Sequence, residues 1–289
     1  IRNSTRDPRL MEPALALAED RIAVAEPLLR SHLQQFPTDV AAIRMLAEIA
    51  SRIGRYSDAE NLLTRCLELA PGFKAARHNY AVVLHRNNKP VEALAQIDQL
   101  LAADPRSPSF RNLKATVLAR VGEYDEAIRL YDQLLREYAL QAKVWLSYGH
   151  ALKTAGRQDA SIAAYRKSIE LEPRLGEAYW SLANLKTFRF TETDVAAMRA
   201  QLERSDLTQE DRFHFHFALG KAAEDARDYA DSFHHYAQGN RLRKEVVPYD
   251  SGTVSENVRR SRALFTPGFF AARRGVGCAT PDPIFVVGL

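Results

Sequence analysis

Small, turn-forming and helix-ending residues recur along this chain every 34 positions, with large apolar residues at helical spacing between them. Proline marks one column of the repeat: Pro37, Pro71, Pro105 and Pro173, with Ala139 at the vacant step. A turn column of the same period reads Gly54, Asn88, Gly122 and Gly156. A shared period in several columns indicates an array of similar units rather than one globular core.

Two further columns hold small residues, one on each of two helices per unit. The first reads Ala47, Ala81, Ala115, Gly149 and Ala183, and the second reads Ala59, Ala93, Ala127 and Ser161. Small side chains let antiparallel helices approach closely, while Gly or Asn accommodates the left-handed backbone that ends the first helix. Proline then stops the second helix. The pattern predicts an all-α fold, an α-solenoid of helix-turn-helix repeats wound into a right-handed superhelix.

With these columns the chain resembles the tetratricopeptide repeat (TPR) family, whose 34-residue repeat carries small, small and proline positions in these places. The resemblance implies four repeats at residues 40–73, 74–107, 108–141 and 142–175, which together form a domain at 40–175. Degenerate repeats are expected at 176–246. Residues 1–37 are expected to form an N-terminal helical cap, because end repeats must shield the array from solvent.

In that family the first helix of each repeat lines a concave groove that binds extended peptides or partner helices. The residues expected to face the groove are basic or imidazole side chains: Arg44, Arg52, His78, His85, Arg86, Arg120, His150 and Lys153. The planar arginine fork suits carboxylate, phosphate or sulfate groups. The pattern therefore predicts a basic groove for an acidic peptide or protein, with ordinary solvated charges as the alternative. Glu48 stands where chaperone-binding TPR proteins place an Asn, so no chaperone is expected as partner.

Composition and charge exclude several classes. Of the 289 residues 46% are hydrophobic and 26% charged, and the formal net charge is only +4, which favours neither nucleic acid nor membrane as a partner. No apolar run reaches the roughly 18 residues of a membrane span. The two cysteines, Cys66 and Cys278, cannot form a disulfide framework and favour a reducing, cytoplasmic compartment. His214 and His216 lack the spacing of three or four that helical metal ligands need, so no metal site is expected.

The last forty residues differ in character. Residues 241–274 hold eight basic and three acidic residues, a net +5, and 247–282 are expected to form a basic linker with a short helix from Ser255 to Phe265. Residues 283–289 read Pro-Ile-Phe-Val-Val-Gly-Leu, which predicts a buried strand running into a tight turn, as at the start of a phosphate-binding loop.

The chain resembles the bacterial TPR-sulfotransferase family in its order of segments. These are the array, the Tyr249-Asp250 pair, the Phe265-Thr266-Pro267 segment, Arg273-Arg274 and this strand. There the strand leads to the loop that binds the phosphosulfate of 3'-phosphoadenosine 5'-phosphosulfate (PAPS). The resemblance implies that 283–289 begin a sulfotransferase domain, with Gly288 and Leu289 at the entrance of the cofactor loop. It places no catalytic residue and no cofactor in this chain, and PAPS only in the parent protein.

Three functional hypotheses remain open from the sequence. The favoured one is the protein-interaction region of a PAPS-dependent sulfotransferase. The others are a free-standing TPR adaptor or scaffold, and a TPR region fused to another P-loop enzyme such as a kinase. Whether the parent is an enzyme, and whether the chain forms a homo-oligomer, is left open.

Overall fold

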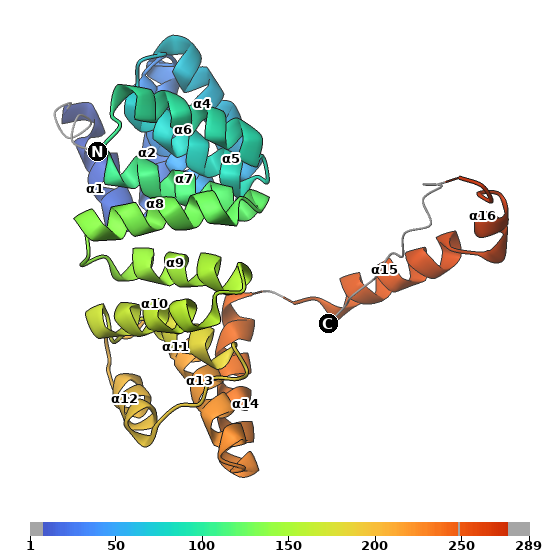
Figure 1. Ribbon diagram of the computed structural model, residues 1–289. Coiled ribbons are helices and arrows are strands. Elements are labelled where there is room, and N and C mark those ends of the chain that lie inside the picture. The colour runs from blue at the N-terminus through green and yellow to red at the C-terminus, as the bar shows by residue number, and fades with distance from the viewer. Residues whose placement is uncertain (1–7, 248, 277–289) are drawn as a thin grey trace.

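The computed structural model describes residues 8–247 and 249–276, and within these ranges it contains sixteen α-helices and no β-strand. Most helices form antiparallel hairpins stacked side by side (Figure 1). These hairpins are α1 (Pro8–Ala18) with α2 (Ile22–Gln35), α3 (Val40–Arg52) with α4 (Tyr56–Leu69), α5 (Lys74–Arg86) with α6 (Pro90–Ala103), α7 (Pro108–Val121) with α8 (Tyr124–Glu137), α9 (Ala142–Thr154) with α10 (Gln158–Leu171), and α13 (Gln209–Asp225) with α14 (Tyr229–Val246). The predicted all-α solenoid is confirmed.

The repeated columns act in the structure as the sequence predicts. Ala47, Ala81 and Ala115 are fully buried between helices. At Gly149 a Cβ atom would lie 2.5 Å from the ring of Tyr165, so α9 and α10 approach more closely there than any larger residue allows. The turn residues adopt positive φ, including 78° at Gly54 and 59° at Asn88. These contacts set the spacing and the turn geometry of successive hairpins.

The N-terminal hairpin continues the same period. The second helices α2, α4, α6, α8 and α10 begin at residues 22, 56, 90, 124 and 158, each 34 residues after the last. Asp20 has φ of 57° in the turn position, one period before Gly54, and Ala25 is fully buried one period before Ala59. The segment expected to be a cap therefore contains a hairpin in register with the array. The repeat columns do not reveal this hairpin in the sequence. Pro13 stands in the column that elsewhere holds a small residue, and Asp20 stands in the column that elsewhere holds Gly or Asn.

The regular pairing stops after α10. Helix α11 (Gly176–Ala183) is short, and α12 (Glu192–Leu202) begins at a capping box formed by Thr191 and Asp194. Arg166 of α10 binds the Asp194 carboxylate with two hydrogen bonds of 2.5 and 2.8 Å, which ties α12 to the last regular repeat. The same bonds hold the pKa of Asp194 at about 2. Helix α11 packs against α13, so the hairpin α13–α14 closes the stack.

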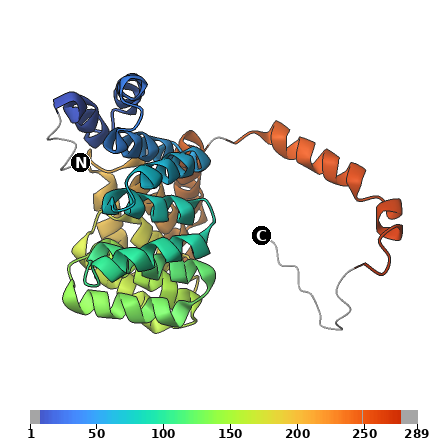
Figure 2. The ribbon, with the colours of Figure 1, turned by 90° about the horizontal axis from the view of Figure 1, so that it is seen from above.

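Beyond the stack, α15 (Ser251–Leu264) and α16 (Pro267–Ala271) project away from the body in both views (Figures 1 and 2). Helix α15 begins four residues before the expected Ser255, because the Asp250 carboxylate accepts the backbone N–H groups of Gly252 and Thr253. Neither helix has a buried residue. The predicted strand at 283–289, with Gly288 and Leu289, lies outside the described residues. None of the helices that the structure describes is long and apolar enough to cross a membrane.

Candidate functional site

The first helices of the repeats line a row of three neighbouring pockets, which we call the groove. The N-terminal pocket, about 260 Å³, lies between α3 and α5 and includes Arg52, His78 and Arg86. The central pocket, about 470 Å³, is lined by His85, Thr116, Ala119, Arg120, Tyr124, Tyr131, Ser147, His150, Ala151 and Thr154. The C-terminal pocket, about 360 Å³, is lined by Lys143, Leu146, Ser147, His150, Leu175, Glu177, Thr208, Glu210, Asp211 and His214. The last two pockets share Ser147 and His150 and are therefore contiguous.

The central pocket is basic and rich in hydroxyl groups. Its lining contains no Asp or Glu. Arg120, exposed at the end of α7, donates a 3.4 Å hydrogen bond to the amide oxygen of Asn88 and forms no ion pair with a described residue. The hydroxyl groups of Thr116 and Tyr131 lie 3.0 Å apart in its wall. An anionic group entering this pocket would meet donors without displacing a carboxylate.

At the end of α5, His85 lines this pocket and Arg86 lines the neighbouring N-terminal pocket. The Nδ1 atom of His85 is buried and has no hydrogen-bond partner among the described residues. Burial, and then the charges of Arg120 and Arg86, lower the pKa of His85, so this imidazole is neutral at neutral pH. Arg86 is exposed and forms no ion pair within the described ranges. Two arginines without acidic partners thus flank a neutral histidine.

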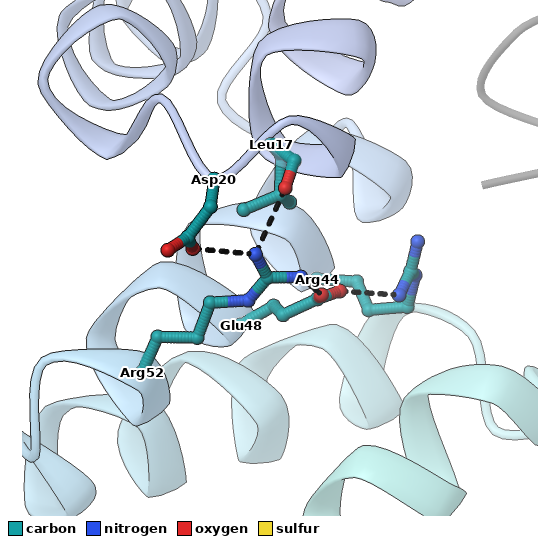
Figure 3. A network of polar contacts seen from close by, with 5 residues as sticks. All are labelled: Leu17, Asp20, Arg44, Glu48 and Arg52. Carbon is teal, nitrogen blue, oxygen red and sulfur yellow. Dashed lines mark hydrogen bonds and ion pairs between the residues drawn. The ribbon is translucent and has the colours of Figure 1, made fainter. Parts of the chain in front are cut away.

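Two of the expected groove residues have a different role. Arg44 is only 5% exposed and lies 3.4 Å from the Glu48 carboxylate, so it does not reach the groove surface. Arg52 donates to the Leu17 carbonyl oxygen at 2.8 Å and pairs with Asp20 at 3.0 Å and Glu48 at 2.5 Å (Figure 3). This network fastens the α1–α2 hairpin to α3. The sequence columns did not reveal it, because Asp20 belongs to the hairpin whose register was hidden.

The remaining predicted residues are only partly brought together. His78 lines the N-terminal pocket and lies 3.3 Å from the Ser109 hydroxyl group. His150 contacts the Tyr165 hydroxyl group at 3.0 Å through Nδ1, and its Nε2 atom is 3.6 Å from Glu177. Lys153 lies on α9 but lines none of the three pockets. Arg120, His85 and His150 are therefore the predicted residues that line the central pocket, whereas Arg86 lines the N-terminal pocket with Arg52 and His78.

The C-terminal pocket holds acidic residues that the sequence analysis missed. Glu177, Glu210 and Asp211 line it against a single basic residue, Lys143. Glu177 stands at the start of α11, where the His150 imidazole, 3.6 Å away, lowers the pKa of its carboxyl group. Glu210 and Asp211 come from α13, beyond the point where the 34-residue columns end. The groove as a whole is consequently not basic but changes sign along its length.

Other reactive side chains take packing roles. Cys66 is fully buried, its Sγ lies 3.3 Å from the Val40 carbonyl oxygen, and burial raises its pKa to about 11, which makes it an inert core residue. His216 and His235 form a 2.9 Å contact between their Nδ1 atoms. Within the described ranges no group of three or more His, Cys, Asp or Glu side chains is placed to hold a metal ion.

A comparison with known protein families identifies the repeat from which this architecture is built. Models described as tetratricopeptide repeat match residues 16–65, 54–117 and 112–183, which together span more than half of the chain. The chain belongs to the tetratricopeptide repeat family. The match from residue 16 includes the end of α1 and all of α2, in agreement with the hairpin in register described above.

Relatives of this TPR chain share its fold at low sequence identity. A tetratricopeptide repeat protein from Parabacteroides merdae ATCC 43184 is 17% identical with a TM-score of 0.58, and the match covers 88% of this chain and 97% of that one. The human IFIT1 dimer with PPP-AAAA also gives 17% identity and a TM-score of 0.58, over 77% of this chain and 55% of that one. An uncharacterized protein of Aquifex aeolicus (strain VF5) is 23% identical over 140 residues, which is 48% of this chain and 18% of that protein. The chain thus spans less than a fifth of that relative.

Proposed function

We propose that this TPR chain is a protein-interaction region whose groove binds an extended peptide segment through an acidic side chain. TPR repeats suggest a protein-interaction role in general. The observation that supports an acidic ligand group is the lining of the central pocket of about 470 Å³, which holds Arg120 and no acidic residue. His85 also lines this pocket, and Arg86, whose charge acts on His85, lines the neighbouring N-terminal pocket; neither arginine has a carboxylate partner among the described residues. A carboxylate of the ligand would supply that partner.

The energetic expectation is modest for each contact. An exposed ion pair contributes roughly 0 to 1 kcal/mol and is screened by salt over about 8 to 10 Å. Arg120 in the central pocket and Arg86 in the neighbouring N-terminal pocket should together contribute about 1.4 kcal/mol to the binding of an acidic peptide, a tenfold change in affinity. Each single arginine substitution should therefore change the peptide affinity only slightly, whereas the double substitution should have a measurable effect.

The double substitution Arg86→Ala with Arg120→Ala should weaken binding of an acidic peptide about tenfold, because it removes both unpaired guanidinium groups. Titration calorimetry against an acidic peptide and its amide counterpart, in which Gln and Asn replace Glu and Asp, measures the effect. In the original chain, affinity for the acidic peptide should fall as salt is raised, and the amide peptide should bind more weakly. Equal binding of both peptides, or an unchanged affinity in the double variant, would refute the proposed groove.

Two further arginines serve as controls. Arg129 is exposed on α8, outside all three pockets, so Arg129→Ala should change neither affinity nor stability beyond the error of measurement. Arg52→Ala should instead lower the free energy of unfolding by about 1 to 2 kcal/mol, because the Leu17 carbonyl group and two carboxylates lose their donor. Its affinity for the peptide should stay within about twofold of the original chain, since its guanidinium group is already paired.

We further propose that the parent protein is a PAPS-dependent sulfotransferase and that the groove presents an acidic partner to it. Support comes from the sequence resemblance at 249–289 and from α15, whose Val254, Val258 and Leu264 are 46%, 48% and 55% exposed. Such a face is typical of a helix that another domain covers. A protein that continues past Leu289 should transfer sulfate from PAPS, whereas residues 1–289 should not bind PAPS. A continuation without a phosphosulfate loop would instead favour the adaptor hypothesis.

A further inference from the structure

We infer that the peptide bound in the groove is dipolar, with an acidic side chain in the central pocket and a basic side chain in the C-terminal pocket. The inference rests on the proposed function and specifies its ligand. It follows from the opposite charge of two pockets that share a wall, Ser147 and His150.

The acidic side chains of the C-terminal pocket are not equally available. The Asp211 carboxylate is occupied, because Oδ1 accepts the Gly176 N–H at 2.9 Å and Oδ2 accepts the Thr208 hydroxyl group at 2.6 Å. Glu210 is exposed and forms no ion pair with any residue that the structure describes. Glu177 forms no ion pair with a described Lys or Arg, and the His150 imidazole lies 3.6 Å from its carboxylate. Glu177 and Glu210 are therefore the two carboxylates that can bind a cationic ligand group.

His214 is a further polar residue in the wall of the C-terminal pocket. It lines the same pocket, is only 8% exposed, and its Nδ1 atom has no hydrogen-bond partner among the described residues. Burial lowers its pKa, so the ring is neutral at neutral pH and one nitrogen can accept a hydrogen bond. Buried polar atoms are rarely left without a partner. The neutral ring therefore adds a polar wall to the pocket without a positive charge that would oppose a cationic ligand group.

The two pockets also fix the spacing of the ligand charges. The central pocket lies between α7 and α9, and the C-terminal pocket lies between α9 and the pair α11 and α13. Neighbouring packed helices are about 10 Å apart, and an extended chain advances about 3.3 Å per residue. The acidic and basic side chains should therefore be about three residues apart.

An entirely acidic segment fits this groove poorly. Its second carboxylate would enter the pocket that already holds Glu177 and Glu210, and like charges brought together oppose binding. A lysine at the same place would meet two carboxylates and the His214 ring. The C-terminal pocket thereby acts as a selectivity site, while the central pocket supplies the contact to the acidic group.

Titration calorimetry with blocked peptides tests the inference. The peptides differ only at two positions three residues apart, as Asp-Ala-Ala-Lys, Asp-Ala-Ala-Asp and Lys-Ala-Ala-Lys, and acetylated and amidated ends keep terminal charges out of the comparison. The original chain should bind the Asp-Lys peptide about fivefold more tightly than the Asp-Asp peptide. In the double variant Glu177→Gln with Glu210→Gln this preference should disappear. Glu192→Gln, on the exposed start of α12 and outside the three pockets, is the matched control and should keep the preference.

The possible failures separate the two proposals. If the Asp-Asp peptide binds as tightly as the Asp-Lys peptide, the dipolar ligand is refuted while the acidic contact in the central pocket stands. If the preference survives in the Glu177→Gln and Glu210→Gln variant, with its circular dichroism unchanged, the C-terminal pocket is not the selectivity site. If none of the three peptides binds, the proposed peptide-binding function fails together with this inference.

Discussion

The substitution Gly176→Ala should lower the free energy of unfolding by about 2 to 3 kcal/mol, at the upper end of the effects of overpacking. A Cβ atom at this position would lie 2.4 Å from the backbone oxygen of Asp211, and a backbone atom cannot rotate away. The α11–α13 contact would have to open, which would also separate Glu177 from Glu210 and Asp211 across the C-terminal pocket. Urea unfolding followed by circular dichroism measures the loss.

Gly72→Ala is the matched control for this substitution. A Cβ atom at Gly72 meets nothing within 4 Å, so the variant should be as stable as the original chain. Equal stability of the Gly176→Ala and Gly72→Ala variants would show that α11 and α13 are not packed as described. A Gly176→Ala chain that folds should also lose part of its preference for the Asp-Lys peptide.

Acidification should destabilise the C-terminal end of the array by about 3 kcal/mol through the contacting pair His216 and His235. The pKa of His216 is lowered to about 4, first by burial and then by the charges of His235, His234, Arg212 and Arg241. In the unfolded chain a histidine titrates near 6.5. Between these two pH values the unfolded state binds a proton at His216 that the folded state does not bind. The free energy of unfolding therefore decreases as the pH falls from about 6.5 to 4. The pKa of His235 is lowered as well, which adds to the loss in the same direction.

Urea unfolding at pH 7 and pH 4.5 tests this dependence. The variant His216→Gln should be less stable than the original chain at pH 7, because the contact with His235 is lost, but its stability should change less between the two pH values. His234→Gln, at an exposed neighbouring position, should keep most of the original pH dependence. A His216→Gln variant with an undiminished pH dependence would assign the acid sensitivity to other groups.

The sequence predicted those parts of the fold that depend on local geometry. The buried Ala47 and Ala81, the tight approach at Gly149 and the left-handed turn at Asn88 each have one physical cause, which recurs every 34 residues. A recurring cause is visible in a single sequence. The N-terminal hairpin was not recognised as a repeat, because Asp20 adopts the left-handed turn without being Gly or Asn.

The candidate site was less predictable because it depends on contacts between repeats. Arg52 and Arg120 occupy the same column, yet Asp20 and Glu48 neutralise the first while the second keeps no carboxylate partner among the described residues. The acidic wall of the C-terminal pocket combines Glu177 of α11 with Glu210 of α13. No column of the repeat relates these two residues, and only the short α11 and its packing on α13 bring them together.

Photo-crosslinking of a bound peptide tests the central claim, that the groove formed by the first helices receives the partner. An Asp-Lys peptide with a photoreactive group between its two charges should form adducts on α7 and α9, whose residues line the central pocket and the wall shared with the C-terminal pocket. An excess of unmodified Asp-Lys peptide should suppress these adducts, and the double variant Arg86→Ala with Arg120→Ala should show fewer of them. Adducts confined to α6 and α10, or to α15, none of which lines the central or the C-terminal pocket, would place the binding surface elsewhere and contradict the account.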